Sequence, residues 1–131
     1  MKNSKVLTAF LIVAGLLLAF IGGSTLLMPV EMKAGAGIDL AGNISVLNDT
    51  RASAALLFAV AILTFLGAFR ENLRFTSTLV SSLLFLSLGV GRLLSILLDG
   101  MPVEGLLGAT VLEFVLGITG AILFTTFRNK P

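Results

Sequence analysis

Two oppositely charged residues stand inside long hydrophobic stretches of this sequence. Arg92 lies in the segment GVGRLLSILLDGMPVEG, and Glu113 lies in the apolar run that follows it. Arg92 is ten residues before Pro102, and Glu113 is eleven residues after it. If both runs are helices that fold back at Pro102, a rise of 1.5 Å per residue places both charges roughly 15 to 17 Å from the hairpin tip. Equal depth predicts an ion pair, because a lone charge inside a membrane costs at least about 2.5 kcal/mol.

Other polar residues extend this predicted pair into a candidate site. Ser95 and Asp99 follow Arg92 at spacings of three and seven residues, so all three share one helical face. Arg51 precedes another hydrophobic stretch and can reach the same polar track from a neighbouring helix. The predicted site is the set Arg51, Arg92, Ser95, Asp99 and Glu113, with Glu104 at its rim.

Three interpretations of this site remain open from the sequence. In the first, Arg92 and Glu113 only neutralise each other and set the register of two helices. In the second, two arginines against one deep carboxylate leave positive charge for an anionic or zwitterionic group, such as a phosphate or carboxylate. The third is a proton path through Glu113, which is disfavoured because no further carboxylates continue it across the membrane.

Four hydrophobic stretches must position these residues. The chain has 131 residues, of which 56% are hydrophobic and only 12% charged, and its mean hydropathy is +1.07. Such a composition predicts a membrane protein, and a membrane-spanning helix needs about 20 apolar residues. The stretches that qualify are residues 6–28, 52–69, 75–98 and 103–127. We therefore predict an all-α, transmembrane four-helix up-down bundle that forms a single domain over residues 1–131, in contact with the lipid bilayer.

The distribution of charge predicts the orientation of this bundle. Basic residues before the first stretch, around the second connection and after the fourth stretch fall on one side of the membrane, and acidic residues predominate on the other. The basic set is Lys2, Lys5, Arg70, Arg74, Arg128 and Lys130, and the acidic set is Glu31, Asp39, Asp49, Asp99 and Glu104. By the positive-inside rule both termini are cytoplasmic. A bacterial inner membrane location and a polar site that faces the periplasm follow from this orientation.

The composition also limits the chemistry of the site. Cysteine and histidine are both absent, which excludes disulfides and ordinary zinc or copper sites. We predict no metal, no cofactor and no catalytic residues, because no pair of nucleophile and base is visible. The net charge of +2 is dispersed over helix ends, so no nucleic-acid partner is expected.

The connections and helix faces carry weaker signals. Residues 29–51 form the only sizeable connection and are predicted as a plain loop, although alternation at 30–33 and 44–47 allows a small hairpin or a lid. The segment NDTR, residues 48–51, is expected to cap the second span. Small residues recur every four positions in three spans, which predicts helix contacts within the chain or between subunits. These small-residue stripes are Gly15, Ala19 and Gly23; Ser87, Gly91 and Ser95; and Ala109, Gly117 and Ala121.

The pattern of these motifs resembles a bacterial domain-of-unknown-function family of small four-span membrane proteins. The resemblance covers almost the whole chain, and its most specific part is Gly91–Pro102, with the pattern GR-x-x-S followed by DG-x-P. The matched positions are Asn48, Arg51, Gly91, Arg92, Ser95, Asp99, Gly100, Pro102 and Glu113. The resemblance implies fold and location and supplies no activity.

The sequence therefore leaves three hypotheses for the function. The first is binding or transport of a small anionic or lipid-like ligand at the polar site. The second is a non-catalytic accessory or scaffolding role, in which a small-residue stripe meets a membrane partner or a second copy of the chain. An enzyme is the third and the least supported by the residues present.

Overall fold

The computed structural model describes Met1 and residues 4–129, so Lys2 and Lys130, which contributed to the predicted orientation, lie outside the described residues. The fold is all-α, as predicted. Its helices are α1 (Lys5–Leu27), α2 (Pro29–Gly35), α3 (Ile44–Phe69), α4 (Glu71–Asp99) and α5 (Glu104–Phe127). Four of them, all except the short α2, are long and apolar enough to cross a membrane. The chain is therefore a multi-pass membrane protein by the length and composition of its helices.

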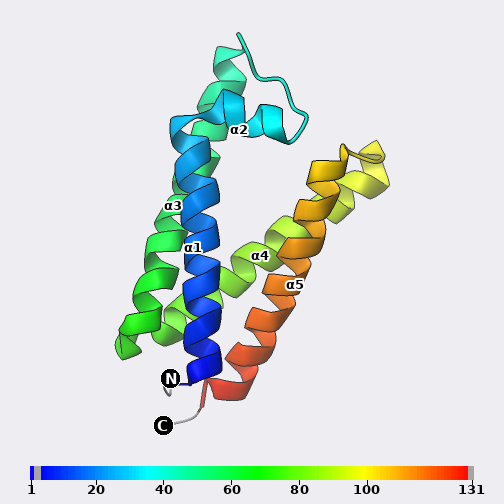
Figure 1. Ribbon diagram of the computed structural model, residues 1–131. Helices are drawn as coiled ribbons and strands as arrows, with labels where there is room; N and C mark the ends of the chain where they lie inside the picture. Colours follow the sequence, from blue (N-terminus) through cyan, green and yellow to red (C-terminus); the bar gives the residue numbers. More distant parts are fainter. Residues whose placement is uncertain (2–3, 130–131) are drawn as a thin grey trace.

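The four long helices run alternately up and down. The start of α1 and the end of α5 lie at one end of the molecule, near the turn between α3 and α4 (Figure 1). We call this the closed end. The opposite end, which holds α2, the start of α3 and the turn between α4 and α5, is called the open end. Many large apolar side chains on the outer faces are exposed, as expected for helices that face lipid.

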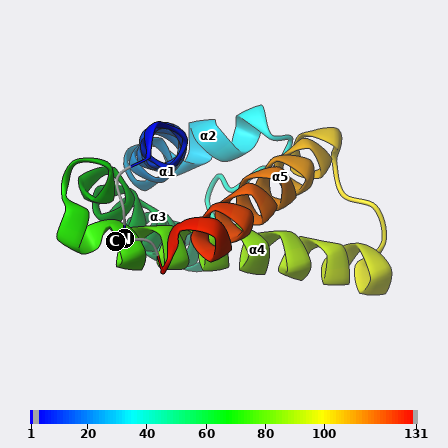
Figure 2. The same cartoon turned by 90° about the horizontal axis from the view of Figure 1, so that it is seen from below.

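The four long helices form two pairs that diverge toward the open end. Helix α1 packs along α3, and α5 packs along α4. Helices α3 and α4 are closest at their connecting turn and separate toward the open end, so that the molecule is V-shaped (Figures 1 and 2). Within the described residues α3 and α5 do not contact each other. The bundle is therefore closed at the terminal end and split at the other.

Small and hydroxylated residues pack the closed end. Thr64, Ser77, Thr78, Ser81 and Ser82 are all buried, and each hydroxyl donates a hydrogen bond to a backbone carbonyl. Ser77 Oγ bonds Leu63 O at 2.7 Å and so joins α4 to α3. Because these hydroxyls are satisfied locally, they allow close approach of the helices without an unpaired hydroxyl group.

The second predicted span begins earlier than expected, and the prediction of a plain loop over residues 29–51 was wrong. Helix α3 begins at Ile44, and Asn43 caps it by accepting a hydrogen bond from Val46 N at 3.1 Å. Residues 48–51 therefore lie inside the helix and do not cap it. The stretch at 30–33 is also helical, because Pro29 stands in the first turn of α2, where its missing N–H is harmless.

The connection between α3 and α4 is also shorter than the one over residues 70–74 that the predicted spans leave, because only Arg70 separates the two helices. Arg74 lies within α4 and is buried, with 3% of its surface exposed. Its guanidinium donates to Gly67 O at 3.2 Å and to Ala68 O at 3.1 Å. These carbonyls belong to the last turn of α3, where a cation is favourable. Arg74, which was predicted to lie at the connection between the second and third spans, thus lies within α4 and caps the end of α3.

Two of the three small-residue stripes contact a neighbouring helix. In α1, Gly15 lies against Phe65 of α3, and in α5, Gly117 lies against Leu86 of α4. The third stripe, on α4, does not: Ser87, Gly91 and Ser95 are exposed, and no atom lies within 4 Å of a Cβ built on Gly91.

Candidate functional site

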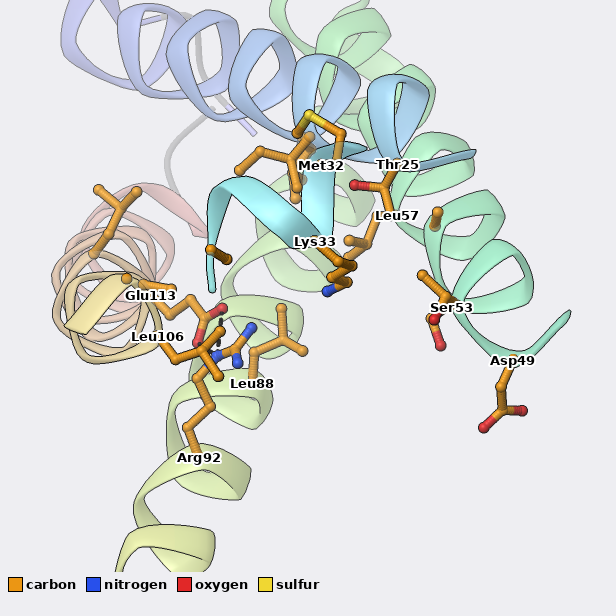
Figure 3. A pocket seen from close by; sticks show the side chains of 18 of the residues that line it. Thr25, Met32, Lys33, Asp49, Ser53, Leu57, Leu88, Arg92, Leu106 and Glu113 are labelled. Atoms are coloured by element: carbon orange, nitrogen blue, oxygen red, sulfur yellow. Dashed lines mark hydrogen bonds and ion pairs between the residues drawn. The ribbon is translucent and has the colours of Figure 1, made fainter. Parts of the chain in front are cut away.

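The candidate site is a cavity of about 740 Å³ toward the open end, between the diverging helix pairs. All five helices contribute to its walls. Most of the lining is apolar, with leucines from α1, α3, α4 and α5, but charged and hydroxyl side chains also face it. The polar lining residues are Thr25, Lys33, Ser45, Asp49, Thr50, Ser53, Arg92 and Glu113, and Figure 3 shows several of them.

Arg92 and Glu113 form an ion pair on the wall made by α4 and α5. Arg92 Nε donates to both carboxylate oxygens, at 2.8 Å to Oε2 and 3.0 Å to Oε1. The Glu113 side chain is 11% exposed and that of Arg92 is 33% exposed. Glu113 is held between the helices because it lies one turn from Gly117, where α5 approaches Leu86 of α4 closely.

The geometry of the pair leaves donors available. The carboxylate is bound through Nε alone, and neither terminal nitrogen of the guanidinium, Nη1 or Nη2, has a hydrogen bond to any residue that the structure describes. The guanidinium of Arg92 lies at the cavity, on the side toward Lys33 in Figure 3. Each terminal nitrogen carries two N–H donors, so this wall can still bind an anion.

Helix α2 supplies a second cation. It bridges from the end of α1 toward the start of α5, where Ala36 lies beside Gly105 and Gly37 beside Val103. Gly37 has φ of +84°, a conformation that suits glycine and turns the chain back from this contact. In this position α2 directs Lys33 to the cavity, and the Lys33 ammonium has no hydrogen bond or ion pair within the described residues.

Helix α3 forms the wall opposite Glu113. Ser45, Asp49 and Ser53 recur every four residues, so they share the helical face that lines the cavity. The carboxylate of Asp49, which is exposed, has no ion pair or hydrogen bond in the described part of the chain. Figure 3 shows Asp49 and Ser53 across the cavity from Arg92 and Glu113. The two walls thus present charges that are not in contact with each other.

Three residues of the predicted site do not reach the cavity. Arg51 is exposed and its Nη1 donates to Leu26 O, which ties α3 to α1. Ser95 Oγ donates a hydrogen bond to Asp99 Oδ2 at 2.9 Å on the exposed end of α4, apart from Arg92. Of the polar residues predicted along α4, only Arg92 therefore reaches the cavity, because α4 separates from α3 toward the open end. Glu104, the predicted rim residue, is exposed and also does not line the cavity.

Conversely, Lys33, Asp49, Ser45 and Ser53 line the cavity and were not predicted as site residues. A usable signal existed for α3, since the spacing of Ser45, Asp49 and Ser53 is that of one polar helical face. That signal was hidden because the segment was predicted as loop. No signal of this kind marks Lys33, whose position depends on where α2 packs.

The arrangement is suited to binding. A cavity with apolar walls and a few placed polar groups is the usual form of a small-molecule site. Within the described residues, no group of three or more Asp or Glu side chains is placed to hold a metal ion.

Four apolar spans around a mostly apolar cavity with a few polar groups define a small multi-pass membrane protein. The family model described as "Domain of unknown function (DUF4345)" matches residues 6–124, and the chain belongs to this family. The match includes every residue that lines the cavity. No curated protein and no solved structure matches the chain.

Proposed function

We propose that this protein binds, or moves, an amphiphilic ligand with an anionic group in the cavity at its open end. The observation that carries the proposal is the ion pair itself: Arg92 holds Glu113 through Nε, and both terminal nitrogens have no partner among the residues that the structure describes. A purely structural pair would use its donors on the carboxylate, as bidentate pairs do. The donors that remain suit a phosphate or a carboxylate.

The apolar lining indicates that the rest of the ligand is lipid-like. The deeper walls are formed by side chains such as Leu18, Ile21, Leu57 and Phe85. Cavities of roughly 300 to 1,000 Å³ typically enclose small-molecule ligands, and 740 Å³ falls within this range. The cavity lies between two helix pairs that diverge toward the open end. A lipid of the surrounding bilayer therefore has a lateral route to it.

We further propose that the protein lies in a bacterial inner membrane with both termini in the cytoplasm and the open end toward the periplasm. Lys5, Arg70 and Arg128 lie at the closed end. The open end holds five acidic residues against two basic ones, namely Glu31, Asp39, Asp49, Asp99 and Glu104 against Lys33 and Arg51. This asymmetry supports the orientation by the positive-inside rule.

Native mass spectrometry of the gently extracted protein tests the proposed function. We expect an additional non-protein mass on the wild type that is lost in Arg92→Gln. The matched control is Arg51→Gln, which removes an arginine that does not line the cavity and should retain the mass. Lys33→Gln, on a different helix, should also weaken retention. An additional mass that persists in both Arg92→Gln and Lys33→Gln, or no such mass on the wild type, would contradict the proposal.

The competing function is a scaffold in which the ion pair is purely structural. One observation favours it: the stripe Ser87, Gly91 and Ser95 on α4 is exposed, and no helix of the described residues packs against it. In the same experiment, a clean protein mass for the wild type, with Arg92→Gln less stable, would support this second function. A partner helix would then be expected on the stripe.

A further inference from the structure

We infer that the ligand is zwitterionic and carries a primary ammonium group, which binds at Asp49. This inference rests on the proposed function and extends it to the headgroup of the ligand. It begins from the two walls of the cavity. The wall of α4 and α5, together with α2, offers Arg92 and Lys33, whereas the wall of α3 offers Asp49. A ligand with one sign of charge would leave one of these walls without a partner.

The charges that line the cavity sum to zero. Lys33 and Arg92 are cationic and Asp49 and Glu113 are anionic, which gives +2 and −2. Asp49 is exposed at the mouth of the cavity and Glu113 is buried, and charges beside apolar walls are screened less than charges in bulk water, so their balance affects which ligand binds. An anionic ligand would make the occupied site negative, whereas a zwitterion keeps it neutral. Its anionic group would neutralise Lys33 and accept hydrogen bonds from Arg92, and its cation would neutralise Asp49.

The neighbours of Asp49 favour a primary ammonium over a quaternary one. Ser45, Thr50 and Ser53 lie near Asp49 on α3 and line the same cavity. Their hydroxyl oxygens can accept hydrogen bonds from those N–H groups of a primary ammonium that do not bind Asp49. Quaternary ammonium groups have no N–H donor and are typically held by several aromatic rings. Phe85 is the one aromatic side chain among the described residues that line the cavity.

The apolar part of the cavity then identifies the class of ligand. An anion and a primary ammonium on one headgroup, attached to an acyl chain, describe an amino-phospholipid. A soluble phosphoamine shares the headgroup chemistry but has no group for the leucine-rich walls. The structure therefore points to the lipid, and the experiment separates the two sources.

The test measures which probe the purified protein retains in native mass spectra after exposure to vesicles. The vesicles contain equal amounts of phosphatidylethanolamine, phosphatidylglycerol and phosphatidylcholine, and soluble phosphoethanolamine is supplied in a separate arm. We expect the wild type to retain phosphatidylethanolamine about tenfold or more over the other two lipids, the effect of one hydrogen bond to a charged group. In Asp49→Asn this preference should fall to about one while retention of phosphatidylglycerol persists.

The control is Asp99→Asn, which removes an exposed carboxylate outside the cavity and should leave the preference unchanged. If Asp49→Asn keeps the preference while Arg92→Gln loses all lipids, the inference on the headgroup is wrong and the proposed function stands. If the wild type retains no probe, the proposed function itself fails. Retention of phosphoethanolamine as strong as that of the lipid would overturn the assignment to a lipid and support a soluble phosphoamine.

Discussion

The closed end of this molecule pairs its buried hydroxyl groups, whereas the open end leaves two charged side chains beside a cavity without a partner among the described residues. At the closed end Thr64, Ser77 and Ser82 are buried, and each donates to a backbone carbonyl. At the open end the Lys33 ammonium and the Asp49 carboxylate have no partner within the described residues. Polar groups that are satisfied inside the chain serve packing, whereas those left unsatisfied beside a cavity remain available to a ligand. The difference separates the structural part of the fold from its candidate site.

The cause of this difference is the size of the residues where helices meet. Apolar side chains gain nothing by leaving lipid for one another, so helix contact in a membrane depends on close packing and hydrogen bonds. Gly67 and Gly120 meet Ser77 and Ser82 at the closed end, where the helices touch. The half of α4 nearer the open end carries exposed leucines in place of such contacts, and there α4 separates from α3.

The largest expected effect comes from breaking the one ion pair of the described residues. Glu113→Leu leaves the charge of Arg92 without a partner, and we expect a loss of about 2 to 3 kcal/mol in the free energy of unfolding in detergent. The double variant Arg92→Leu/Glu113→Leu should recover most of that loss, because two apolar residues need no partner. Equal stability of Glu113→Leu and the wild type would show that Arg92 is fully solvated in the cavity.

A smaller effect is expected from adding one methyl group where α5 meets α4. The Cβ of Gly117→Ala would lie 2.8 Å from Leu86 Cγ and 2.9 Å from Leu86 N, so the two helices must shift. We expect a destabilisation of about 1 to 2 kcal/mol. Gly91→Ala is the matched control on α4, since nothing lies within 4 Å of its Cβ. It should not destabilise the protein, because alanine favours helix more than glycine does. Thermal unfolding of both variants side by side decides the point, and an equal loss in the two would contradict the assigned contact.

The smallest expected effect compares two serines on α4. Ser77→Ala removes the bond to Leu63 O that joins α4 to α3, and a cost of about 0.6 kcal/mol is typical for such a bond in a membrane protein. Ser95→Ala removes only an exposed bond to Asp99, so we expect a smaller change. Titration of both variants with denaturing detergent measures the two losses. A larger loss for Ser95→Ala would reverse the comparison between the two ends.

Sequence alone determined the features that depend on composition and on counting along one helix. The four spans follow from hydropathy, since length and apolarity suffice to cross a bilayer. The common depth of Arg92 and Glu113 follows from their distance to Pro102, because helical rise is constant and the turn is short. The structure brings these two side chains together.

Only the tertiary structure decided which other residues share the cavity with that pair. Asp49 and Lys33 line it because α3 begins at Ile44 and α2 crosses toward α5. Arg51 and Asp99 do not, although their positions along the helices suggested that they would. Depth is a local property of one helix, but the angle between two helices is the sum of many small contacts between distant segments. Those contacts, close at Gly67 and absent at Gly91, hold the closed end together and let the open end separate.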